Sequence, residues 1–228
     1  MAKIKQDDAG FSGEQITIPP PNLKVAVFKI RGSAPYVQNK FSSKAREMMR
    51  ASQEAGSTAK KGRKREPKNF QQCFEQATHI SDEGWYGIPA PAFRNAAVSA
   101  CKICGFHMTK AKLSIFIVQD GFDKDDGTPL IKITKGERIY HEGAVRNATG
   151  VADLRARPMW REGWEADVCV RFDADQFTLE DIANLMARVG MQVGIGEGRP
   201  DSKKSSGMGW GLFDIRQSEE SADAQQAA

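Results

Sequence analysis

The most informative segment of the sequence lies near the C-terminal end and reads GIGEGRP (194–200), DSKKSS (201–206) and GMGWGLFDI (207–215). It contains six glycines, one arginine and two lysines. Glycine adopts positive φ angles and allows close approach of other groups to the backbone. Lysine and arginine supply the charge that phosphates attract. A helical pattern precedes the segment and a short apolar strand pattern follows it, so the segment is predicted to be a phosphate-contacting loop within the fold.

The helix before this loop has clear signals at both ends. Thr178 is predicted to be its N-cap, with Asp181 in the place of the reciprocal capping-box residue. Its apolar stripe runs from Ile182 to Val189, and Gly190 is expected to end it. The loop opens no helix at its own C-terminal end, so it does not fit a Walker or Rossmann nucleotide loop. A polynucleotide chain is therefore a better candidate ligand for the loop than a mononucleotide.

Apolar periodicity defines the other elements. Strands are predicted at 23–31, 112–119, 129–134, 164–172 and 210–215, and helices at 40–53, 70–76 and 91–104. Pro91 is a favoured first helical residue, and Gly105 is a natural C-terminal cap. Residues 135–163 show little regular pattern beyond extended pieces near 138–141 and 155–160.

Without its insertions, the chain reads strand, helix, strand and again strand, helix, strand. This order predicts an α+β fold of the ferredoxin-like, split βαβ type, in which an antiparallel sheet carries both helices on one face. RNA-recognition modules of this kind bind single strands on the free face. We expect an N-terminal arm (1–22), a core (23–216) with insertions at 33–82 and 135–163, and a disordered acidic tail (217–228).

The charge distribution is more informative than the mild net charge of +4. Six basic residues lie within nine positions: Lys60, Lys61, Arg63, Lys64, Arg65 and Lys68. Such a block is either a solvated loop or a nucleic-acid contact. The second basic site, in the glycine loop, favours the nucleic-acid interpretation.

No metal or cofactor is expected. Cys101 and Cys104 have the spacing of half a zinc site, but the sequence has no matching second pair, so we interpret them as small apolar residues on a buried helix face. The acidic segment 120–126 lacks the glutamate that a calcium loop requires, so it is interpreted as an acidic turn. The segment MAKIKQDD (1–8) has no signal-peptide core, and no apolar run reaches about 18 residues, so we expect a cytoplasmic protein without membrane contact.

Two segments resemble a known family. IPAPAFRNA (88–96) is similar to the start of the first helix, and SSGMGWGLF (205–213) to the glycine-rich loop, of the repeat-associated mysterious proteins, the RAMP superfamily. The likeness is greatest to the backbone subunits of multi-subunit CRISPR effectors. The resemblance implies single-stranded RNA binding, stacking of protomers into a helical filament and a thumb-like hairpin that props the strand open.

The resemblance also implies that Arg94, Lys203, Lys204 and the backbone of Gly207, Gly209, Trp210 and Gly211 contact the ligand. The charge pattern adds Arg199 of the loop and the basic cluster 60–68 to the expected nucleic-acid contacts. The expected ligand is single-stranded RNA, with single-stranded DNA as an alternative, and the acidic tail could recruit other effector or replication proteins.

Catalysis is not expected, because target-cleaving relatives carry an acidic residue soon after the first strand and residues 31–40 contain none. One alternative is a metal-independent endoribonuclease that uses Tyr140 or His141, although adjacent residues on a strand point to opposite faces. Another is an assembly or inhibitor protein that copies a backbone subunit.

Overall fold

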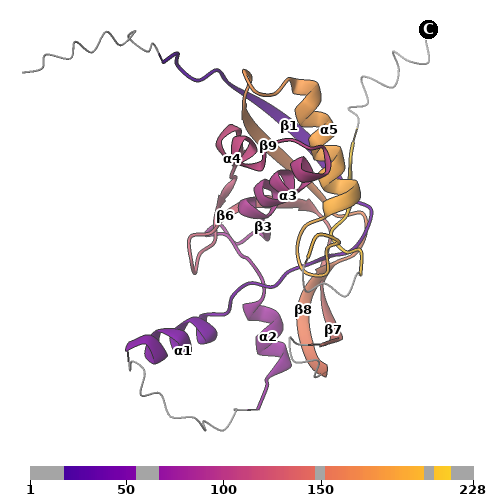
Figure 1. The fold of residues 1–228 in the computed structure, drawn as a ribbon. Coiled ribbons are helices and arrows are strands. Elements are labelled where there is room, and N and C mark those ends of the chain that lie inside the picture. The colour runs from indigo at the N-terminus through magenta and orange to yellow at the C-terminus, as the bar shows by residue number, and fades with distance from the viewer. Residues whose placement is uncertain (1–17, 55–66, 147–151, 203–207, 217–228) are drawn as a thin grey trace, which may run out of the picture.

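The computed structural model describes residues 18–54, 67–146, 152–202 and 208–216. Its helices are α1 (Ser43–Glu54), α2 (Phe70–Gln76), α3 (Ala90–Ile103), α4 (Met108–Ser114) and α5 (Leu179–Arg188), which a π turn, η2 (Val189–Val193), extends. Its strands are β1 (Leu23–Gly32), β2 (Tyr36–Val37), β3 (Gly87–Pro89), β4 (Ile115–Val118), β5 (Gly121–Phe122), β6 (Pro129–Lys135), β7 (Arg138–Arg146), β8 (Ala152–Trp160), β9 (Glu165–Asp173) and β10 (Phe213–Ile215). The fold is α+β with two antiparallel sheets (Figure 1).

The larger sheet has β1 and β9 at its centre. They pair antiparallel from Leu23↔Asp173 to Arg31↔Glu165, and β10 lies on the other edge of β1. Beyond β9, β4 pairs with one end of the strand and β6 with the other end. The strands β10, β1, β9 and β4 therefore lie side by side in that order.

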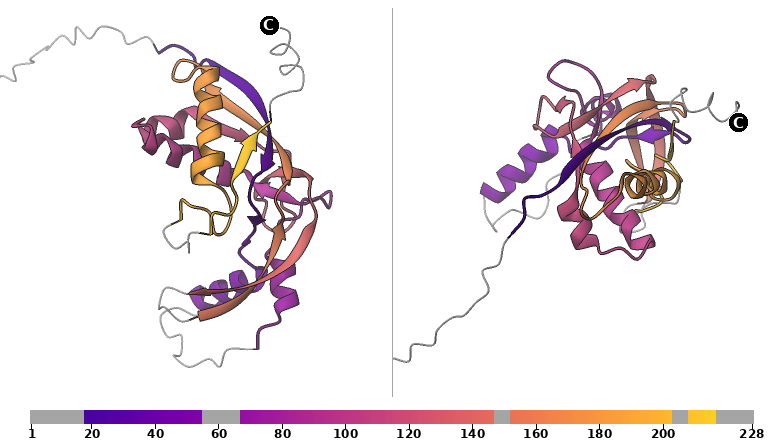
Figure 2. Two further views of the ribbon diagram at one scale, coloured as in Figure 1. Left: turned by 90° about the vertical axis from the view of Figure 1, so that its right-hand side faces the viewer. Right: turned by 90° about the horizontal axis from the view of Figure 1, so that it is seen from above.

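Helices cover one face of this sheet (Figures 1 and 2). Phe28 and Ile30 of β1 point into the core beneath them, together with Val168 and Val170 of β9. The alternate residues of β1 lie on the other face, where Val25 and Val27 are 60% and 61% exposed. Period-two alternation thus places one apolar set in the core and leaves the opposite face open.

The smaller sheet is built on a hairpin that projects from the body (Figure 2, left). β7 and β8 pair from Arg138↔Trp160 to Arg146↔Ala152, and β2 pairs with the base of β8. α2 packs against β8. Trp160 at the base is fully buried, which joins the hairpin to the main core.

The sequence predicts most of these elements correctly, and the capping box of Thr178 and Asp181 is present at the start of α5. The predicted helix at 40–53 begins only at Ser43, because Lys40 is buried and paired elsewhere. The predicted strand at 210–215 is shorter, because Gly211 has a φ of +72° and β10 begins at Phe213.

The predicted strand 112–119 was wrong in its first half. Residues 112–114 end α4, a helix that the sequence pattern did not reveal, and β4 begins at Ile115. Good helix formers such as Met, Lys and Ala dominate this segment, and Ala111 is fully buried.

Gly190 was expected to end α5, but the helix continues as η2 to Val193. A Cβ atom at Gly190 would lie 2.0 Å from the Phe213 carbonyl oxygen, so this glycine admits β10 against the helix. The chain leaves the helical conformation at Gly194, whose φ is +70°.

Candidate nucleic-acid interface

The start of α3 and the first part of the glycine-rich loop meet in one cleft of about 550 Å3. One wall is the N-terminal part of α3 and the second is the loop from Ile195 to Ser202. The third is formed by β2 and the residues that follow it, together with Arg155 of β8. The residues that line the cleft are Tyr36, Gln38, Asn39, His79, Pro89, Ala92, Asn95, Ala96, Ser99, Arg155, Ile195, Gly196, Glu197, Gly198, Arg199, Asp201 and Ser202.

Helix α3 presents a small, polar stripe and its N-terminus to this cleft. Ala92, Asn95, Ala96 and Ser99 recur at helical spacing along the wall. The N-cap is Pro89, and within the described part of the chain no side chain caps the first turn. The first N–H groups of a helix have no partner inside it and carry a partial positive charge. This wall therefore suits an anionic ligand.

The glycines of the loop serve its own packing. A Cβ atom at Gly196 would lie 2.5 Å from the Val37 carbonyl oxygen, and one at Gly211 would lie 1.8 Å from that of Ile195. A Cβ atom at Gly198 would lie 2.5 Å from the Trp210 ring. All three have positive φ angles, as does Gly209, whose Cβ position is open. The loop thus folds tightly onto β2 and onto itself, which is a different use of glycine from the ligand approach expected from the sequence.

Two arginines of β8 hold the loop against the hairpin. Arg157 Nε lies 2.7 Å from Glu197 Oε2, and Arg155 Nη1 lies 3.3 Å from Glu197 Oε1. Arg199 points back to the loop, where its Nη1 donates to the Gly196 carbonyl at 2.9 Å. Of these four residues the sequence interpretation included only Arg199. Arg155 and Arg157 are far from Glu197 in the chain, so no local pattern could have revealed the group.

The aromatic residues at the hairpin lie on opposite faces of β7. His141 packs edge-on against Trp210, with ring centroids 5.4 Å apart, and so links the hairpin to the glycine loop. Tyr140 instead packs against Phe74 and donates a hydrogen bond to Glu142, which raises the pKa of its hydroxyl. Tyr140 and His141 therefore do not converge on one point, as the strand geometry predicts.

Other predicted contact residues lie away from the cleft. Arg94 donates to the carbonyl of Ile115 at 3.1 Å and to that of Lys112, so it fixes α4 and β4 to α3. Lys68 is paired with Asp153 on the hairpin. The predicted contacts Lys60, Lys61, Arg63, Lys64, Arg65, Lys203, Lys204 and Gly207 lie outside the described residues.

A buried charge network lies at one end of the cleft. It includes the segment 120–126, for which the sequence predicted only an acidic turn. Lys40 Nζ lies 2.6 Å from both Asp123 Oδ1 and Asp125 Oδ2. His79, which lines the cleft, places Nδ1 2.8 Å from Asp123 Oδ2. Burial lowers the pKa of His79, which favours its neutral form. Burial opposes ionisation of Asp123, but the hydrogen bonds from Lys40, the Asp125 backbone N–H and His79, with the charge of Lys40, together outweigh it, so the pKa of Asp123 is lowered.

This network could hold a metal only by displacing its lysine. Ligand atoms of His79, Asp123 and Asp126 lie within 4.8 Å of one another. However, the ammonium group of Lys40 already contacts Asp123, and Arg46 pairs with Asp126 at 3.0 Å. The protein's own cations thus neutralise these carboxylates.

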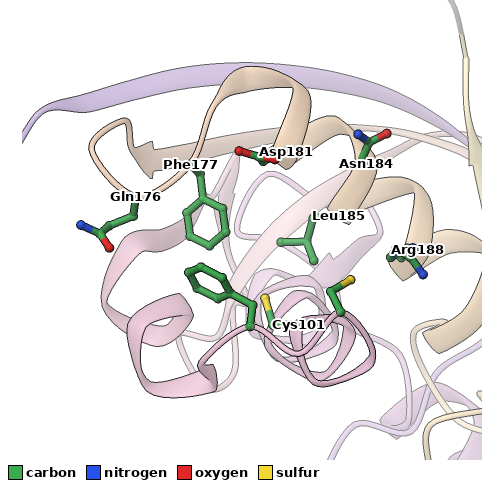
Figure 3. A pocket seen from close by; sticks show the side chains of 9 residues that line it. Cys101, Gln176, Phe177, Asp181, Asn184, Leu185 and Arg188 are labelled. Atoms are coloured by element: carbon green, nitrogen blue, oxygen red, sulfur yellow. The ribbon is translucent and has the colours of Figure 1, made fainter.

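A smaller pocket of about 270 Å3 lies between α3 and α5 (Figure 3). Phe106 and Phe177 pack against each other in it with tilted rings whose centroids are 4.7 Å apart, and Cys101 also lines it. Burial raises the pKa of the Cys101 thiol to about 11, while Cys104 is exposed. Cys101 therefore behaves as an apolar core residue, as the sequence indicated, whereas Cys104 does not.

Comparison of the sequence with models of known protein families finds no match, and comparison with curated proteins finds none either. Among the described helices, none has the length and apolar character needed to cross a membrane.

Proposed function

We propose that this protein binds single-stranded nucleic acid, with RNA favoured over DNA, and that it assembles along its ligand as a RAMP-type backbone subunit does. The proposed fold is the ferredoxin-like, split βαβ arrangement. Its support is the strand order β10-β1-β9-β4, in which α3 connects β1 to β4 and α5 connects β9 to β10.

The observation that carries the proposal is that the first resembling segment, at the start of α3, and the first part of the glycine-rich loop, about 100 residues further along the chain, line the same cleft. The start of α3 contributes Pro89 and Ala92, and the loop contributes residues 195–199, 201 and 202, which precede the second resembling segment. Arg155 lines the cleft from the projecting hairpin, which we compare with the thumb that the resemblance implies. A helix N-terminus and two lining arginines, Arg155 and Arg199, with Arg157 beside them on Glu197, give this cleft groups that can contact a phosphate backbone.

The free face of the sheet is a poorer candidate than the cleft. RNA-recognition modules stack bases on aromatic residues of that face. Here β1 presents Val25 and Val27, and the Phe116 ring on β4 lies beneath the guanidinium of Arg171, 5.4 Å from its centroid. We therefore place the strand in the cleft and along the hairpin.

The test is a binding titration of the full chain. Fluorescently labelled homopolymeric RNA, homopolymeric DNA and a duplex are titrated at several salt concentrations. We expect binding to the single strands, with affinity that falls steeply with salt and depends little on sequence, because released counterions dominate the free energy. Binding to neither single strand at low salt would overturn the proposal.

Electron microscopy tests assembly separately. With single-stranded RNA we expect elongated particles that are absent when the RNA is omitted. Single particles of unchanged size in both samples would remove the assembly part of the proposal and leave the binding part standing.

A further inference from the structure

The Glu197 carboxylate pairs with two arginines of the hairpin. It lies between two guanidinium groups, and each of its oxygens accepts from a different arginine. The side chains of Arg155, Arg157 and Glu197 are 32%, 16% and 20% exposed. The group is thus sheltered but reachable from the cleft that Arg155 and Glu197 line.

The chemistry of the two acceptors is interchangeable. A carboxylate and a phosphodiester both offer two oxygens that share one negative charge, and guanidinium groups recognise either through paired N–H donors. Arg155 and Arg157 are two positions apart on β8, so their side chains emerge on the same face of the hairpin. A strand that follows this face would meet both guanidinium groups in succession.

The loop that carries Glu197 is anchored apart from this contact. The Glu197 backbone N–H donates to the Val37 carbonyl at 2.9 Å, and Gly196 and Gly198 on either side hold their own packing contacts. The Glu197 side chain can therefore leave the arginines by rotation about its own bonds while the loop keeps its place.

We propose that Arg155 and Arg157 form a phosphodiester subsite in the cleft and that Glu197 acts as its internal competitor. A bound strand exchanges the carboxylate for a backbone phosphate, and the carboxylate turns to solvent. This inference rests on the proposed function, which it deepens by naming a phosphate subsite and its regulation. A lone phosphate gains little from the exchange, whereas a strand that contacts several subsites displaces Glu197, so the device favours chains over mononucleotides.

The experiment compares single-strand affinity in charge-matched variants. Glu197→Gln removes the competitor, and Asp201→Asn removes one negative charge from the same cleft wall. None of the ion pairs among the described residues includes Asp201. Removing a competing, partly exposed ion pair should tighten binding of labelled RNA by about 2- to 10-fold for Glu197→Gln. We expect a smaller change for Asp201→Asn.

Arginine variants complete a mutant cycle with Glu197→Gln. Arg155→Ala with Arg157→Ala should weaken binding and should abolish the gain from Glu197→Gln when all three changes are combined. Thermal unfolding of each variant identifies any that has lost its fold, and Arg157→Lys then replaces the alanine change.

The outcomes separate the two ideas. The subsite proposal fails, and the proposed function stands, if the unaltered protein binds RNA but Glu197→Gln gains no more RNA affinity than Asp201→Asn. The same holds if Glu197→Gln binds RNA more weakly than the unaltered protein. If no variant binds a single strand at low salt, both fail.

Discussion

Two glycines of the loop region, separated by one residue, serve different purposes, and this difference can be measured. Gly209 and Gly211 both have φ near +70°, which L-residues adopt at a cost. Only Gly211 is also crowded, because a Cβ atom there would lie 1.8 Å from the Ile195 carbonyl oxygen, whereas the same position at Gly209 is open.

We therefore predict that Gly211→Ala destabilises the fold far more than Gly209→Ala. The backbone conformation alone should cost about 1–3 kcal/mol in both variants. The steric clash adds to this only at Gly211, where the backbone of Ile195 must move away. Urea denaturation gives both values, and equal losses of unfolding free energy would contradict the close contact.

At the scale of single elements, Arg138 joins the hairpin to α2. Its guanidinium donates to Glu75 at 2.9 Å and to the Thr78 hydroxyl at 2.9 Å. It also stacks on the rings of Phe74 and Tyr86, at 4.4 and 5.0 Å from their centroids. A planar, forked group is needed for all of these contacts at once, and lysine cannot supply it.

Arg138→Lys should therefore lower the unfolding free energy by about 1–2 kcal/mol, mainly through the lost stacking and one lost hydrogen bond. Hydrogen exchange should accelerate first in α2. Arg188→Lys is the matched control, because Arg188 makes one exposed hydrogen bond to Gln192, and it should change stability little. Similar losses of unfolding free energy in the two variants would contradict the stabilising role of the Arg138 contacts.

Some helices and strands of this protein can be predicted from the sequence, and others cannot. α5 and β9 are predictable because their apolar residues follow one clear period and a capping box marks the helix start. The β7–β8 hairpin is not predictable in this way, because it projects from the body of the protein. Tyr140 and Leu154 are exposed and Gly143 within β7 has no side chain, so burial imposes no clean alternation of apolar residues.

At the scale of the whole molecule, the candidate site depends on contacts between distant segments. The sequence located two of its walls, the start of α3 and the glycine loop, because each has a local composition that can be recognised. It could not locate Arg155 and Arg157, because only the folded structure brings Glu197 into contact with them. The network of Lys40, His79 and Asp123 was missed for the same reason, since tertiary pairing alone makes it buried and neutral.

This network should make the stability of the protein depend on pH. Burial holds the pKa of His79 below its ordinary value of 6.5, so the unfolded chain binds a proton more readily than the folded one. Stability then rises with pH: the contribution of His79 is complete above about pH 6.5 and is lost as the pH falls from that value through the lower pKa of the folded state. The pKa of Asp123 is also lowered, from 3.8, so its contribution is lost only at more acidic pH.

We predict that the unfolding free energy of the unaltered protein decreases between pH 7.5 and 5.5 and that His79→Gln makes this decrease shallower. The variant should also be less stable at pH 7.5 by about 1–3 kcal/mol, because buried Asp123 loses a hydrogen-bond partner. His107, an exposed residue at the start of α4, provides the control, and His107→Gln should keep the slope of the unaltered protein. If His79→Gln keeps that slope as well, the acid sensitivity arises elsewhere and burial of His79 does not couple protonation to folding.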